Sequence, residues 1–96
     1  MENNKEIIVE HLKKKIKFLE NELVSTIKDA KKLENDIEKS KLTISTYEYF
    51  KTNKEDVEYA KENIKSTKKT IEVNDKLIEL QANQLASLKA NLSWIE

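Results

Sequence analysis

The side chains of this chain that could do acid–base or metal chemistry are carboxylates, lysines and a lone histidine, His11. Eighteen acidic groups balance eighteen basic groups, so the formal net charge is zero. His11 has no second histidine and no cysteine to complete a usual zinc site. No glycine is present for a glycine-rich phosphate loop. Because such groups catalyse inside a concave site that excludes water, the elements that position them decide whether they act.

Two heptad runs define those elements, one over residues 9–47 and the other over residues 57–95. In both runs the residues step alternately by three and four, which keeps one side of a helix facing a partner helix. Folding the chain between the runs places Tyr47 against Val57 and Val9 against Ile95. We call these two runs the seam. It comprises Val9, Leu12, Ile16, Leu19, Leu23, Thr26, Ala30, Leu33, Ile37, Ser40, Ile44 and Tyr47, then Val57, Ala60, Ile64, Thr67, Ile71, Asn74, Ile78, Gln81, Leu85, Leu88, Leu92 and Ile95.

The pattern predicts an all-α fold, a single antiparallel coiled-coil hairpin over residues 1–96. We expect helix one at about residues 5–51 and helix two at about residues 54–94, because no glycine or proline interrupts either run. A single continuous helix is the alternative. It fails because continuing the first run past Tyr47 brings charged residues, beginning with Lys51, onto the seam.

The turn is predicted at residues 52–53 from helix-capping signals. Thr52 and Glu55 have the spacing of a capping box. Asn53 is an alternative N-cap, and Glu55 and Asp56 then stand in the first helical turn, where carboxylates complement the helix dipole.

Five seam positions are polar and each faces an apolar or small residue across the predicted hairpin. A buried polar group without a partner costs about 1–3 kcal/mol. Either these layers are half exposed and hydrated, or another chain supplies their partners. The polar positions are Thr26, Ser40, Thr67, Asn74 and Gln81, and they face Ile78, Ile64, Ile37, Ala30 and Leu23 in turn.

Helix two carries a second run at heptad spacing, and none of its members is charged. In a chain that is 38% charged, this pattern indicates a face for a partner helix or for self-association, whereas chance placement of surface serines and asparagines is the plainer reading. We expect Val73, Leu77, Leu80 and Trp94 to make the contacts. The full run is Tyr59, Asn63, Ser66, Thr70, Val73, Leu77, Leu80, Gln84, Ser87, Asn91 and Trp94.

Off-seam apolar residues also gather near the turn. Tyr49 and Phe50, extended by Leu42 and Tyr59, either cover the open end of the hairpin or form an exposed binding patch. Near the other end, Ile7, Ile8 and Phe18 are off-seam apolar residues as well.

Composition argues against several classes of protein. Every basic residue is lysine, so the chain lacks the arginine guanidinium groups that usually bind phosphates and base edges. The lysines also form no continuous basic surface, and both features disfavour direct nucleic-acid binding. No apolar run approaches the ~20 residues that span a membrane. We expect no enzyme activity, no catalytic or metal-binding residues and no cofactor, because a two-helix hairpin offers no enclosed pocket.

Two stretches, HLKKKIKFLENEL at His11–Leu23 and STYEYFKTNKEDVEYA at Ser45–Ala60, resemble the phyllogen family of secreted phytoplasma effectors. The resemblance covers nearly the whole chain and rests on overall pattern. It implies a helical hairpin that acts in the host cytoplasm and nucleus as a non-enzymatic virulence effector. Phyllogens bind the keratin-like coiled-coil domain of floral MADS-domain transcription factors and recruit a proteasome-shuttle protein. The transcription factors are degraded and flowers become leaf-like. A secretory leader, which the printed sequence lacks, is expected to have been cleaved or left out.

Two other functions fit the pattern. The chain could be a structural or assembly protein of a bacterium or phage that only self-associates through its coiled coil. A prefoldin-like holdase is a third reading, which needs open apolar tips such as the one at Tyr49 and Phe50.

Overall fold

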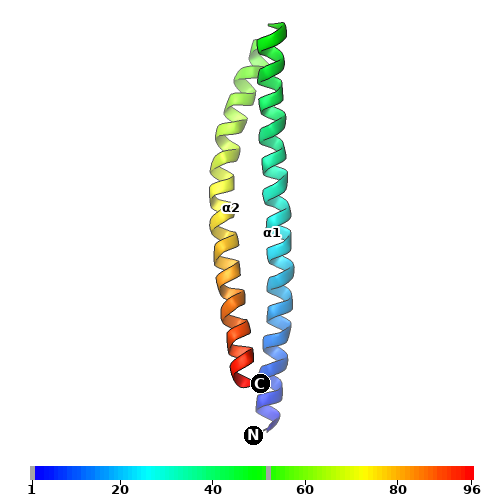
Figure 1. Ribbon diagram of the computed structural model, residues 1–96, viewed down its shortest axis with the longest axis vertical. Helices are drawn as coiled ribbons and strands as arrows, with labels where there is room; N and C mark the ends of the chain where they lie inside the picture. The colour runs from blue at the N-terminus through cyan, green and yellow to red at the C-terminus, as the bar shows by residue number, and fades with distance from the viewer. Residues whose placement is uncertain (1, 52) are drawn as a thin grey trace. The chain divides into compact units, whose positions relative to one another are not determined.

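The computed structural model describes residues 2–51 and 53–96, and these residues form two long helices (Figure 1). Helix α1 spans Glu2–Phe50 and helix α2 spans Lys54–Ile95. The prediction of two helices in an all-α hairpin is confirmed, with α1 beginning somewhat earlier and α2 ending one residue later than expected. Both helices run without interruption because the chain contains no proline, which lacks an amide hydrogen, and no glycine, which lacks a side chain.

The turn that ends α1 uses left-handed backbone at two residues that are not glycine. Lys51 and Asn53 both have φ of 56°. The Lys51 amide donates to the Tyr47 carbonyl at 2.6 Å, which is the hydrogen bond of a helix C-terminus closed by a left-handed residue. An L-residue other than Asn or Asp enters this region at a cost of about 1–2 kcal/mol, so Lys51 is a strained position in the turn.

Asn53 occupies the N-cap position directly before α2, and its main-chain carbonyl accepts the first hydrogen bonds of that helix. Its carbonyl accepts hydrogen bonds from the amides of Asp56, at 3.0 Å, and Val57, at 3.4 Å. Glu55 and Asp56 stand in the first turn of α2, as predicted. The capping box expected of Thr52 lies outside the described residues.

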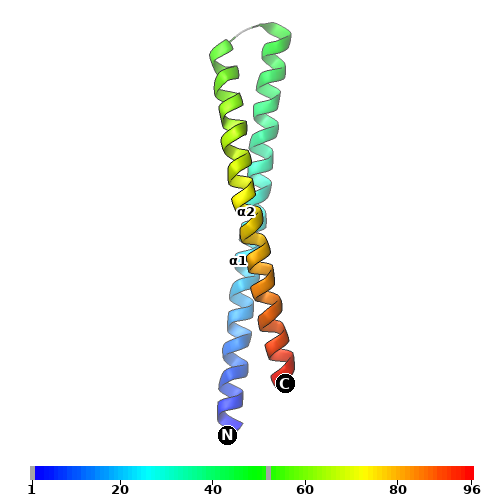
Figure 2. The same cartoon turned by 90° about the vertical axis from the view of Figure 1, so that its left-hand side faces the viewer.

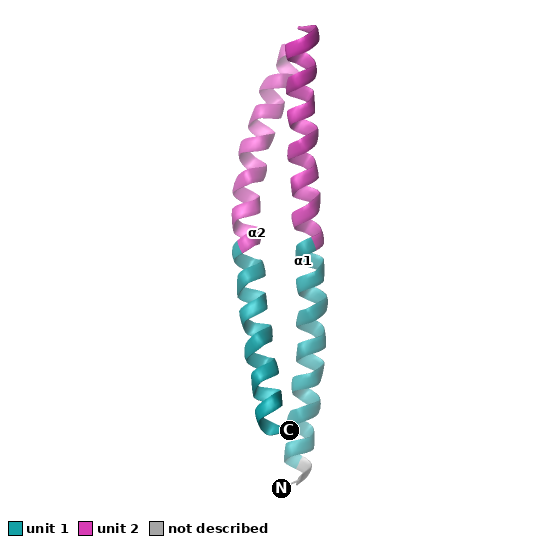
Figure 3. Cartoon of the chain, viewed as in Figure 1, with its two compact units in different colours: residues 1–27, 76–96 teal, residues 28–75 magenta. Residues whose placement is uncertain are grey.

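The chain divides into two compact units, shown in different colours in Figure 3. Unit 1 comprises Met1–Ile27 and Lys76–Glu96, and unit 2 comprises Lys28–Asp75. In unit 1, Lys13 on α1 pairs with Glu96, which directly follows α2, and Glu20 on α1 pairs with Lys89 on α2. Because α2 numbers fall as α1 numbers rise, the two segments of unit 1 are antiparallel. In unit 2, Figure 2 shows the green segments of α1 and α2 running in opposite directions, and Asn63 of α2 donates a hydrogen bond to Ser40 of α1.

The predicted seam is the core of both units. Every one of its positions is buried or half-buried, and among the other residues in 4–51 and 53–96 only Asn63 is not exposed. The most buried apolar side chains are Ile16 in unit 1 and Ile37, Val57 and Ala60 in unit 2. None of the described large side chains is completely buried, because a pair of helices covers each seam from one side only.

The polar side chains of the seam differ in their hydrogen-bond partners. Thr26 donates to the carbonyl of Glu22 in its own helix at 2.9 Å. Ser40 accepts a hydrogen bond at 2.9 Å from Asn63 of α2, a residue next to its predicted neighbour Ile64. Gln81 is buried, and its Oε1 atom has no hydrogen-bond partner among the described residues. For Ser40 the partner is a side chain of the hairpin itself, beside the expected neighbour Ile64, whereas the sequence predicted hydration or a partner from another chain.

The described stretches contain no helix whose length and apolar character would let it cross a lipid bilayer.

Candidate partner-binding surface

The uncharged run on α2 forms an exposed surface, which we call the α2 stripe. Ten of its eleven side chains are exposed, because each stripe residue stands one position before a seam residue, beside the side of α2 that packs on α1. Its apolar members Val73, Leu77 and Leu80 lie on successive turns of the same side of α2. Trp94, the lone tryptophan of the chain, is 89% exposed. The four residues expected to make partner contacts therefore need no movement of the hairpin to become accessible.

Asn63 is the exception among the α2 stripe positions. Its side-chain amide donates to Ser40, so it belongs to the interface between α1 and α2 in unit 2. The sequence reading of Asn63 as part of an open face is therefore corrected. The heptad position beside a seam is close enough for a long polar side chain to reach a buried partner.

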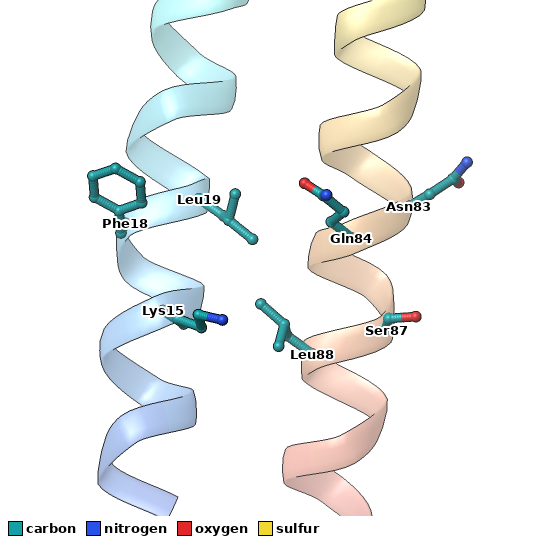
Figure 4. A pocket seen from close by; sticks show the side chains of 7 residues that line it. All are labelled: Lys15, Phe18, Leu19, Asn83, Gln84, Ser87 and Leu88. Atoms are coloured by element: carbon teal, nitrogen blue, oxygen red, sulfur yellow. The ribbon is translucent and has the colours of Figure 1, made fainter.

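A hollow of about 520 Å³ lies next to the α2 stripe in unit 1. Figure 4 shows Leu19 of α1 and Leu88 of α2 pointing toward each other across it, while the ring of Phe18 points away from α2. Two α2 stripe residues, Gln84 and Ser87, also line it. A partner side chain lying along α2 thus has a largely apolar depression beside it in unit 1.

Phe18 gives this hollow an exposed aromatic border. Its side chain is exposed, as expected for an off-seam apolar residue near this end of α1. Lys15 lines the same hollow and supplies its charged group, and Asn83 completes the lining. The sequence identifies Phe18 as an off-seam apolar residue but does not predict that it lies beside the α2 stripe. That neighbourhood depends on the distance between the two helices.

At the turn, Tyr49 and Phe50 pack against each other and not into the seam. Their ring centroids are 4.8 Å apart with an interplanar angle of 72°, an edge-to-face pair. Tyr49 is 81% exposed and Phe50 is also exposed. The reading in which these two rings fill the end of the hairpin is therefore wrong, and both remain available as surface groups.

Leu42 and Tyr59 are exposed too, but they border two different hollows in unit 2. Leu42 lines one of about 240 Å³. Tyr59 lines another of about 350 Å³. Both hollows include Thr43 and Asp56. Unit 2 therefore presents its apolar groups around a shallow polar centre instead of as one continuous patch.

Sequence reasoning missed one pair of exposed apolar residues, Val24 and Ile27 on α1. Val24 directly follows the seam residue Leu23, and Ile27 directly follows the seam residue Thr26. The heptad pattern therefore does not distinguish them from the seam itself. Both side chains are exposed in unit 1. They match Leu77 and Leu80 in exposure without being part of the α2 stripe.

The groups of this chain that could bind a metal ion are His11 and the carboxylates. His11 is exposed, as expected of a surface histidine. Within residues 2–51 and 53–96, no three His, Cys, Asp or Glu side chains come together in a way that could hold a metal ion.

Comparisons with protein-family models, with curated proteins and with solved structures find no match to this chain.

Proposed function

We propose that this chain is a non-enzymatic binding protein that holds an amphipathic helix of a partner protein against the α2 stripe. The observation that carries the proposal is the exposure of ten uncharged side chains in a heptad run on one long helix. Charged residues make up 38% of the chain, so a run of this length without charge leaves a face that is easy to desolvate.

The arrangement of the α2 stripe suits recognition of a helix. Val73, Leu77 and Leu80 follow the four- and three-residue spacing at which one helix presents anchors to another. Polar, uncharged residues continue the run on both sides of these anchors, which permits close approach without leaving a charge unpaired. Exposed aromatic groups stand near its ends, at Tyr59 and Trp94, and such side chains contribute much of the binding energy at protein interfaces.

The resemblance to phyllogens supplies the proposed partner. It points to the keratin-like domain of floral MADS-domain transcription factors, whose amphipathic helices would lie on the α2 stripe. In this proposal the chain is a secreted effector that acts in the host cytoplasm and nucleus. A proteasome-shuttle protein binds elsewhere on the chain, and the exposed turn residues Leu42, Tyr49 and Phe50 are a candidate site for it. The outcome is degradation of the transcription factor and leaf-like flowers.

Binding of the purified full chain to a keratin-like domain tests the interface. Two variants with matched changes decide it, L77E/L80E on the α2 stripe and V24E/I27E on α1. Leu77 and Leu80 are 42% and 54% exposed, and Ile27 and Val24 are 43% and 52% exposed, so both variants add two carboxylates to equally exposed apolar sites. We expect L77E/L80E to weaken binding by about a hundredfold or more, since two interface anchors are lost. V24E/I27E should bind as the unmodified chain does.

Circular dichroism of both variants shows whether each remains helical. Fluorescence of Trp94, the lone tryptophan, gives a second measurement, because a helix on the α2 stripe should shield its exposed ring from a soluble quencher. Equal binding by both helical variants would reject the α2 stripe as the interface. Failure of the unmodified chain to bind any keratin-like domain would reject the proposed partner.

The degradation step is tested separately in plant cells. Co-expression with a floral MADS-domain protein should lower the amount of that protein, and a proteasome inhibitor should restore it. The Y49A/F50A variant should still bind the transcription factor but no longer lower its abundance if the turn residues recruit the shuttle protein. Normal degradation with Y49A/F50A would place the shuttle site elsewhere.

A further inference from the structure

The side of each hairpin unit away from the α2 stripe is an edge of charged residues. In unit 1 its charged residues directly follow the seam residues Leu12, Leu19, Leu88 and Ile95, and Ile27 and Ala82 occupy the remaining pair of positions. There the charges are complementary across the two helices. Lys13 Nζ lies 3.6 Å from Glu96 Oε1, and Lys89 Nζ lies 3.4 Å from Glu20 Oε1.

In unit 2 the same register brings like charges together at two of its three pairs of positions, and the third pair, Glu48 and Lys61 next to the turn, is complementary. Glu34 and Asp75 occupy the positions that correspond to the Glu20–Lys89 pair two heptads further along α1. Lys41 and Lys68 occupy the next such positions, one heptad closer to the turn. Facing groups of like charge repel each other across an antiparallel pair of helices. Within a single chain this edge of unit 2 is therefore poorly matched.

The neighbouring charges extend each like-charged pair into a cluster. Glu38 and Glu72 lie beside the acidic pair, and Lys65 lies beside the basic pair. At the boundary, Lys41 Nζ is 3.6 Å from Glu38 Oε1. All seven side chains are exposed. The edge of unit 2 thus carries an acidic cluster of Glu34, Glu38, Glu72 and Asp75 next to a basic cluster of Lys41, Lys65 and Lys68.

We propose that this edge of unit 2 binds the same edge of a second copy of the chain, with the two copies antiparallel. The centres of the like-charged pairs are one heptad apart, about 10 Å along a helix at 1.5 Å per residue. A two-fold axis between them places the acidic cluster of each copy on the basic cluster of the other. Every contact then occurs twice, as a two-fold interface requires.

The charge complementarity determines what kind of dimer this is. Ion pairs near a protein surface are screened by salt, so the association is strong at low ionic strength and weak at high ionic strength. The interface lies away from the α2 stripe of each copy. The dimer therefore presents two partner-binding stripes, which raises the effective affinity for a partner that is itself oligomeric.

Two charge-reversal variants of the full chain test the proposal by sedimentation at low salt. K41E/K68E makes the edge of unit 2 acidic, and E34K/D75K makes it basic. Each variant alone should dimerise at least about tenfold more weakly than the unmodified chain. An equimolar mixture of the two should form a heterodimer as tight as the original dimer, because the complementary pairs are restored between copies.

A further variant with the same change in net charge controls for general attraction between oppositely charged proteins. K69E/K76E alters two exposed lysines on the outer side of α2. Alone it should dimerise as the unmodified chain does, whereas it should not form a tight heterodimer with E34K/D75K. Helicity measured by circular dichroism shows that each variant is folded.

Three results would overturn the proposal. They are a chain that stays monomeric at low salt and high concentration, dimerisation of folded K41E/K68E at the original strength, and equal heterodimer formation by the K69E/K76E control. The L77E/L80E variant separates this interface from the partner-binding surface, since it should dimerise normally while losing the partner.

Discussion

The side-chain amide of Asn63 donates a hydrogen bond at 2.9 Å to the hydroxyl oxygen of Ser40, joining α2 to α1 inside unit 2. Ser40 is a buried seam residue, and Asn63 is half-buried beside the seam. A single polar contact of this kind can fix the register of a coiled coil, because any slip along the helices leaves both groups buried without partners. The polar layer at Ser40 is thus a specific contact between the helices.

Removing this hydrogen bond should destabilise the hairpin measurably. We expect Asn63→Ala to lower the free energy of unfolding by about 1 kcal/mol, the usual net contribution of a partly buried hydrogen bond. Urea unfolding followed by circular dichroism measures the change. Ser66→Ala is the matched control, because Ser66 is an exposed member of the α2 stripe and should change stability by less than about 0.5 kcal/mol. Equal effects of the two substitutions would contradict a structural role for the contact.

Gln81 should be a site where an apolar substitution stabilises the protein. It is buried in unit 1, its Oε1 atom has no partner among the described residues, and the mirrored seam places it opposite Leu23. Gln81→Leu removes an unpaired buried acceptor, which costs about 1–3 kcal/mol, and should raise the free energy of unfolding by about 1 kcal/mol or more.

The control for this prediction is Gln84→Leu, three residues away on the exposed α2 stripe. It makes the same chemical change without removing a buried acceptor, so the midpoint of urea unfolding should move little. A stabilisation by Gln84→Leu as large as that by Gln81→Leu would show that helix propensity, and not the buried amide, is responsible.

Lys51→Gly should stabilise the turn. Glycine adopts the left-handed conformation that Lys51 holds, with φ of 56°, without the clash of a side chain. Part of the gain is offset because glycine makes the unfolded chain more flexible, so we expect a net increase of about 0.5–1 kcal/mol in the free energy of unfolding. Lys51→Ala keeps the clash and should bring no such gain. If both substitutions have the same effect in thermal unfolding, loss of the lysine charge is the cause.

The heptad spacing predicts the seam fully because burial in a helix pair depends only on which side of the helix a residue occupies. Leu19 and Leu88 meet across the hollow in unit 1 for this reason. The backbone of the turn is harder to predict, since a chain with no glycine gives no signal of where left-handed residues fall, and Lys51 is an uncommon choice.

Side-chain reach limits prediction of the surface in the same way. Periodicity assigns Asn63 to an open face, and only the distance between the helices reveals that its amide reaches Ser40. The exposed positions of Leu77, Leu80 and Trp94 are predictable because they lie outside the seam. What binds there depends on the chemistry of another molecule, which the period of this chain does not encode.

The like-charged pair of Glu34 and Asp75 predicts opposite effects of one substitution on stability and on self-association. Asp75→Lys gives Glu34 an oppositely charged neighbour, as Glu20 and Lys89 have in unit 1. At protein concentrations where the chain is monomeric, we expect the coupling between positions 34 and 75 to change by about 0.3–0.5 kcal/mol in favour of the folded state. The same substitution should weaken the dimer, because it removes an acidic group that pairs with the basic cluster of the other copy.

A double-mutant cycle isolates this coupling from effects within α2, where the new lysine also gains Glu72 and Glu79 as neighbours. The stabilisation by Asp75→Lys should be smaller when Glu34 is first changed to Gln, and the difference is the coupling between the two helices. Glu62→Lys, an acid-to-lysine change on the outer side of α2, should leave both the coupling and the dimer unaltered. If Asp75→Lys stabilises the monomer equally with and without Glu34, the two side chains do not face each other in unit 2.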